Sequence, residues 1–160
     1  MAPRPPRFLE DQYDAYPDNQ ELKTVYFQAE GLSYTGGDRH VLLWWYNDFQ
    51  PGSAPVIQIV QLTGQGGNYQ YYAPVANTRD LQTLMKRHLQ VELGMYSRAD
   101  RDKILTLADS VVFSKSSVTN GCRVWTRDLL SAMVSSGLLD LSIFRQIVEQ
   151  VPLPERVAEQ

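Results

Sequence analysis

The stretch His40-Val-Leu-Leu-Trp-Trp-Tyr46 decides the fold that this sequence predicts. It is rich in β-branched and aromatic residues, which favour an extended strand. Successive side chains of a strand point to opposite faces, so Trp44 and Trp45 cannot lie on the same side of a sheet. One face is expected to carry His40, Leu42, Trp44 and Tyr46, and the other Val41, Leu43, Trp45 and Asn47.

Similar strand patterns surround this stretch between Leu22 and Ala76. Short segments rich in Gly, Pro, Asn and Asp separate them, and these residues favour turns. We therefore expect an antiparallel meander of three to four strands. The expected strands are residues 23–28, 40–47, 56–62 and 69–75, with turns at 36–38, 51–53 and 64–68.

After Asn77 the apolar spacing becomes helical. Helices are expected behind the N-caps Thr78, Ser97 and Asp140, and a further one from the cysteine turn to Gly137. A strand-rich half followed by a helix-rich half predicts an α+β fold, in which the antiparallel sheet packs against several helices.

The chain has 160 residues, of which 43% are hydrophobic, enough for one domain with its own core. We assign that domain to residues 21–152. Prolines crowd residues 1–20, which are expected to form a flexible arm that contributes little to stability. Residues 153–160 are expected to form a C-terminal tail.

The charge and the cysteine content limit which partners, which compartment and which cofactors are expected. The formal net charge is −3, so nucleic acid and anionic membranes are not expected as partners. A single cysteine and the lack of a signal-like or membrane-length apolar run favour the cytoplasm. One cysteine and two histidines are too few for a closed zinc site, and no phosphate-binding loop is recognisable, so we expect no metal and no cofactor.

The only cysteine lies in the run Asn120-Gly121-Cys122, at the expected first turn of a helix. Unpaired N–H groups at a helix N-terminus carry partial positive charge and stabilise a thiolate. Asn120 suits the N-cap, and Gly121 leaves the sulfur uncrowded. Cys122 is therefore a candidate nucleophile. The alternative is that it is a small residue of the helix's apolar face.

A nucleophilic thiol requires a base, and the candidates are His40 and His88. His40 begins a strand, which would hold it rigidly, although such a residue can also be merely exposed. His88 continues an apolar helical stripe and is the weaker candidate. The aromatic side chains Trp44, Tyr46 and Trp125 are candidate substrate contacts, with core packing as the alternative.

The order of these features resembles circularly permuted papain-like proteins of the NlpC/P60 type. In that arrangement a histidine strand and a strand with a polar orienting residue precede a helix that begins with cysteine. More narrowly, Phe113-Ser114 and the later run Asn120-Gly-Cys-Arg-Val-Trp125 resemble a group of uncharacterised fungal proteins with a Gly-Cys-Arg-x-Trp signature. The likeness covers about residues 38–139.

The resemblance implies thiol chemistry on an acyl carbon. Cys122 would attack an amide or thioester carbonyl, His40 would transfer the proton, and Gln58, in preference to Gln61, would orient the imidazole. Asn120 would donate to the oxyanion together with the helix N-terminus. We therefore expect a cysteine-dependent hydrolase or acyltransferase that acts on a small, peptide-like metabolite.

Two other classes remain open from the sequence. One is a non-catalytic module that binds a small molecule or peptide on its aromatic face. The other is a biosynthetic cyclase or isomerase that uses His40 and tyrosine hydroxyls without covalent catalysis.

Overall fold

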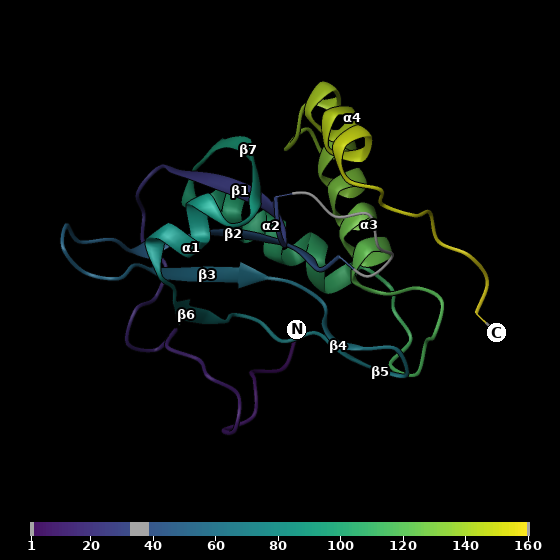
Figure 1. Ribbon diagram of the computed structural model, residues 1–160, viewed down its shortest axis with the longest axis horizontal. Helices are drawn as coiled ribbons and strands as arrows, with labels where there is room; N and C mark the ends of the chain where they lie inside the picture. The colour runs from purple at the N-terminus through teal and green to yellow at the C-terminus, as the bar shows by residue number, and fades with distance from the viewer. Residues whose placement is uncertain (1, 33–38, 160) are drawn as a thin grey trace.

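The computed structural model describes residues 2–32 and 39–159, so the expected turn at residues 36–38 lies outside the described residues. Its centre is a five-stranded antiparallel sheet with the strand order β6-β3-β2-β1-β7 (Figure 1). The strands are β1 (Lys23–Ala29), β2 (Val41–Asp48), β3 (Val56–Val60), β6 (Ala76–Thr78) and β7 (Leu89–Tyr96).

A separate hairpin and the helices complete the fold. The strands β4 (Thr63–Gln65) and β5 (Asn68–Gln70) pair only with each other in the described chain. The helices are α1 (Leu81–Lys86), α2 (Arg98–Ser110), α3 (Cys122–Ser135) and α4 (Leu141–Gln150). The α+β class is therefore confirmed.

The sheet has five strands, not three to four, because β7 replaces part of an expected helix. The sequence pattern extended a helical stripe from Leu81 to Leu89, but α1 ends at Lys86. The next residues alternate between buried and more exposed positions and pair along the whole of β1. Pairing with a central strand outweighs the weak helical pattern of so short a segment.

The expected strand at residues 69–75 is also wrong. Its first residues belong to β5, and the chain then turns through a cis Ala73–Pro74 bond before β6 begins at Ala76. Residues 71–75 belong to no strand, and Pro74 among them cannot donate to a sheet ladder.

The sheet separates two apolar clusters. On one face Val41, Leu43 and Trp45 pack with residues of α2, α3 and α4 such as Ile104 and Trp125. On the other face Leu42 and Trp44 pack with Leu84 of α1. Figure 1 shows α1 in front of the sheet and α2 behind it. The alternation expected for residues 41–45 is thus confirmed.

Several helix ends follow the sequence signals. The side chains of Ser97 and Asp140 accept backbone N–H groups at the starts of α2 and α4. Gly137 follows α3 with a positive φ of 76°, which a glycine adopts without strain. At α1, however, Asp80 rather than Thr78 is the N-cap.

The N-terminal arm contacts the sheet and α2 through hydrogen bonds and a buried ion pair. The Gln12 N–H donates to the Ala76 carbonyl at 2.7 Å, and the Ala73 N–H donates to the Pro3 carbonyl at 3.1 Å. The buried Asp18 carboxylate accepts from Arg101 at 2.9 Å and from Lys23 at 2.8 Å. The arm is therefore held by backbone bonds in both directions and by the Asp18 carboxylate.

Candidate active site

Cys122 is the first residue of α3, and its side chain is half-buried. The N-cap is Gly121, not the expected Asn120, and no side chain caps this end of the helix. A Cβ on Gly121 would lie 2.6 Å from the Tyr69 hydroxyl, so a larger residue here would displace the tyrosine side chain. Because Cys122 is the first residue of α3, its thiol is close to the unpaired N–H groups at the N-terminus of this helix.

His40 immediately precedes β2, at the end of the sheet where α3 begins. Its Nε2–H donates to Oε1 of Gln61 at 2.7 Å. Since the glutamine oxygen can only accept, this bond places a proton on Nε2. The imidazole also interacts with Cys122, as the pKa shifts of both groups indicate.

The thiol and the imidazole shift each other's pKa. Burial raises the pKa of Cys122, but the hydrogen bond and charge of His40, the Val41 N–H and Arg123 outweigh burial and lower it overall. Burial lowers the pKa of His40, whereas Cys122, Gln61 and the charge of Glu30 raise it to about 9. Both shifts favour a thiolate–imidazolium pair at neutral pH.

Gln61, and not Gln58, is the partner of His40. Gln58 is fully buried on the opposite face of β3, where its Oε1 accepts from Asn47 at 3.0 Å. Residues of one strand that differ by an odd number lie on opposite faces. Gln61, just past the end of β3, lines the same cavity as His40 and Leu42 and is therefore on their face of the sheet.

Asn120 does not have a free side-chain donor for an oxyanion. Its Nδ2 donates to the Val157 carbonyl at 2.7 Å and to Glu159 at 2.8 Å, and its Oδ1 accepts from the Val157 N–H. The tail at residues 153–159 is therefore held along α3, where Arg127 also donates to the Leu153 carbonyl. Asn120 anchors this tail.

The three aromatic candidates are packing residues. Trp125 is 1% exposed in the helical core, with its ring 5.1 Å from that of Tyr71. Trp44 is fully buried, stacks on Tyr26 at 4.4 Å and donates to Gln90. Tyr46 is half-buried and packs edge-on against Trp44. None of the three lines the cavity beside His40.

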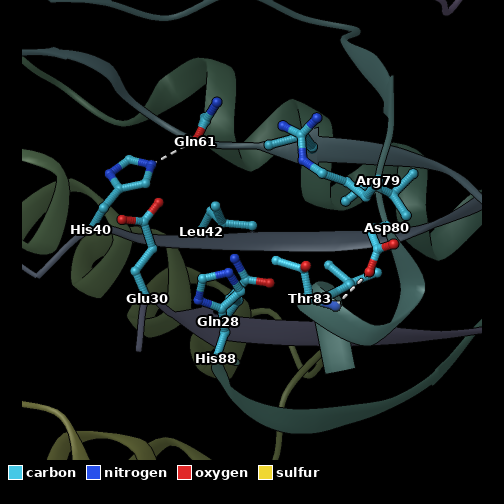
Figure 2. Close-up of a pocket in the computed structure, with 12 residues that line it drawn as sticks. Gln28, Glu30, His40, Leu42, Gln61, Arg79, Asp80, Thr83 and His88 are labelled. Atoms are coloured by element: carbon cyan, nitrogen blue, oxygen red, sulfur yellow. Dashed lines mark hydrogen bonds between the residues drawn. The ribbon is translucent and has the colours of Figure 1, made fainter. Parts of the chain in front are cut away.

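That cavity, of about 300 Å³, lies on the α1 face of the sheet (Figure 2). His40 and Gln61 form one end, Leu42, Ile57 and Ile59 contribute apolar surface, and α1 closes the side. Charged residues also line it, among them Glu30, Arg79 and Asp80. The sequence reading missed these residues because they lie at strand ends and in the loop before α1, where no periodic pattern marks them.

His88 lines the same cavity but has a structural partner, because its Nδ1 accepts from the Gly31 N–H at 3.0 Å. Across residues 2–32 and 39–159, no group of three or more His, Cys, Asp or Glu side chains could hold a metal ion. In the same part of the chain, no helix has the length and apolar character needed to cross a membrane.

Comparisons of the chain with protein-family models, curated proteins and solved structures found no match.

Proposed function

We propose that this protein is a cysteine-dependent hydrolase or acyltransferase, with Cys122 as nucleophile, His40 as acid–base and Gln61 as the residue that orients the imidazole. The observation that supports the proposal is that His40 is bonded to Gln61 and interacts with Cys122, so that the pKa of the imidazole is raised and that of the thiol is lowered. The same order of groups underlies papain-like catalysis, in which a third side chain holds the histidine for the thiol.

The reaction would begin with attack of the Cys122 thiolate on an ester, thioester or amide carbonyl. A sulfur–carbon bond forms, and the electron pair of the carbonyl moves to its oxygen. When the tetrahedral intermediate collapses, the leaving group departs with the proton of the His40 imidazolium, and an acyl-cysteine remains. Water or another nucleophile, deprotonated by His40, then releases the acyl group.

The oxyanion would be stabilised by backbone N–H groups of the first turn of α3. Asn120 is excluded from this role because both of its amide hydrogens are used by the tail. A helix N-terminus supplies donors and a positive potential without a side chain.

Trapping of the acyl group tests the proposal. The protein is incubated with p-nitrophenyl acetate, and intact mass reports acetylation, which can occur on only one cysteine. We expect a burst of p-nitrophenolate, a mass increase on Cys122, and loss of both in Cys122→Ala and His40→Ala proteins. Arg87→Gln replaces an exposed residue that does not line the cavity; it is the control variant and should retain the burst. Added amines that accelerate release would indicate acyl transfer, and water alone would indicate hydrolysis.

The non-covalent alternatives make a different prediction. A cyclase or isomerase that uses His40 as acid–base would keep its turnover in Cys122→Ala, and a binding module would have a thiol that alkylates no faster than an ordinary cysteine. Either result would contradict the proposed nucleophile.

A further inference from the structure

The cavity on the α1 face of the sheet is separate from the thiol. Cys122 does not line it, and the thiol packs with the helical core on the opposite face of the sheet. A ligand in this cavity would therefore be held by the side chains that line it, without contact with the sulfur.

The Gln61 side chain presents an unused donor to this cavity. Its Oε1 accepts from the His40 imidazole at 2.7 Å, so Nε2 is the amide atom left for another partner. Among residues 2–32 and 39–159, no acceptor for Nε2 is found. In Figure 2 this nitrogen lies on the side of Gln61 away from His40. His40 thus orients the amide so that its N–H groups are free.

Arg79 supplies a second set of unused donors. Its backbone N–H donates to the Pro55 carbonyl at 3.0 Å, which fixes the residue beside the start of β3. Its half-buried side chain extends over the sheet in the direction of Gln61 (Figure 2). Nη1 donates to the Thr78 carbonyl at 3.1 Å, and within the described residues the guanidinium contacts no carboxylate. The other guanidinium N–H groups are available to a ligand.

The two acidic residues of the cavity do not neutralise this guanidinium. Asp80 is the N-cap of α1, and its Oδ1 accepts the Thr83 N–H at 2.9 Å. Glu30 lies near His40, where its charge acts on the imidazole. Figure 2 shows each carboxylate beside these partners. Arg79 is therefore an unpaired cation that lies over the sheet.

Apolar side chains and a small volume limit the ligand further. The cavity measures about 300 Å³, at the small end of the range for ligand pockets. Its hydrocarbon surface comes from β2, β3 and α1, through Leu42, Ile57, Ile59 and Leu84. A single unpaired guanidinium matches a monoanion, and the planar donors of an arginine fit a carboxylate.

We propose that this cavity is a non-covalent binding site for a small aliphatic carboxylate. The carboxylate accepts from the Arg79 guanidinium and from Nε2 of Gln61, and the hydrocarbon part lies on the apolar side chains of the cavity. This site goes beyond the proposed thiol chemistry and does not depend on it.

The test compares ligands that differ only in their polar end: hexanoate, hexanamide and hexylammonium. Each is titrated at low ionic strength into the unmodified protein, and Kd is obtained from the NMR shifts of the backbone amides of cavity residues. We expect hexanoate to bind roughly 3- to 10-fold more tightly than hexanamide, as for a single partly exposed ion pair. Hexylammonium should bind most weakly.

Chain length tests the apolar part of the site. Each methylene that becomes buried should tighten binding by up to about fourfold, so butanoate should bind more weakly than hexanoate. Acetate that binds as tightly as hexanoate would indicate an adventitious anion only and would overturn the proposed ligand class.

Variants assign the preference to the two donor groups. Arg79→Gln should reduce the ratio of the hexanamide Kd to the hexanoate Kd to about one. Gln61→Glu retains an oxygen that accepts from His40 but replaces the free donor with a negative charge, so it should weaken hexanoate binding as well. The matched control is Arg87→Gln, which removes an exposed arginine that does not line the cavity and should keep the ratio of the unmodified protein.

An unchanged ratio in Arg79→Gln, tightest binding of hexylammonium, or no shifts at cavity residues would overturn the inference. Its failure is distinguishable from that of the proposed function. Cys122→Ala should still prefer hexanoate to hexanamide, since the thiol is not part of this site. Conversely, a protein that does not bind hexanoate could still be acylated by p-nitrophenyl acetate.

Discussion

Removal of the Cys122 thiol should change the titration of His40 more than any other single substitution at the site. The imidazole is half-buried, and burial by itself lowers its pKa. The contact with Cys122 is the largest of the influences that raise it. In a Cys122→Ala protein we therefore expect the pKa of His40 to fall from about 9 to 6.5 or below.

The free energy of this interaction follows from the two pKa values of His40. The difference between the ordinary value of 6.5 and about 9 corresponds to roughly 3 kcal/mol of interaction that favours the charged imidazole. A folded-state pKa above the unfolded value stabilises the fold below pH 6.5, and this stabilisation is lost as the pH rises through about 9. The lowered pKa of Cys122 gives stability the opposite slope with pH, so the pH dependence contributed by one group of the pair opposes that contributed by the other.

The assay is a pH titration of the two histidines by NMR. The chain contains only His40 and His88, so a His88→Gln protein assigns the signals. A His40 signal that titrates near 9 in Cys122→Ala as well would show that the thiolate is not the source of the shift. One that titrates near 6.5 in the unmodified protein would refute the ion pair itself.

Three further predictions concern groups around the pair. Gln61→Ala should slow alkylation of Cys122 at neutral pH, because the imidazole loses the bond that orients it; an unchanged rate would exclude this role. Arg101→Met should lower the free energy of unfolding by about 3–5 kcal/mol in urea denaturation, because it leaves a buried carboxylate poorly paired. The control Arg98→Met removes a more exposed pair and should cost less than about 1 kcal/mol. Asn120→Ala should lower the free energy of unfolding by about 1–3 kcal/mol and raise the rate of amide hydrogen exchange in residues 153–159. Unchanged protection of these amides would contradict the anchoring role of Asn120.

Features set by local physics were readable from the sequence. The alternation of β2 fixed which of its side chains share a face, because this depends only on strand geometry. The caps at Ser97 and Asp140 and the stop at Gly137 depend on short-range hydrogen bonds and on glycine's conformational freedom. The start of α3 at Cys122 belongs to the same group.

Features set by contacts between distant segments were not readable. The choice between Gln58 and Gln61 depends on the register of β3 against β2, which no single strand specifies. β7 exists because β1 offers an edge to it, although its own residues began as a weak helical pattern. The role of Asn120 required the tail, which lies about forty residues further along the chain and returns to α3.

The N-terminal arm and Arg79 illustrate the same division. Proline content predicted a flexible arm, whereas the contacts of the arm depend on donors from Ala73 and Arg101 that only the fold brings near. Arg79 carries no sequence signal, since an arginine after a short strand is usually solvated. Local sequence thus determined that Cys122 begins a helix and that His40 lies at the start of a strand. The tertiary structure decided what surrounds them, because strand register and helix packing join residues that are far apart in the chain.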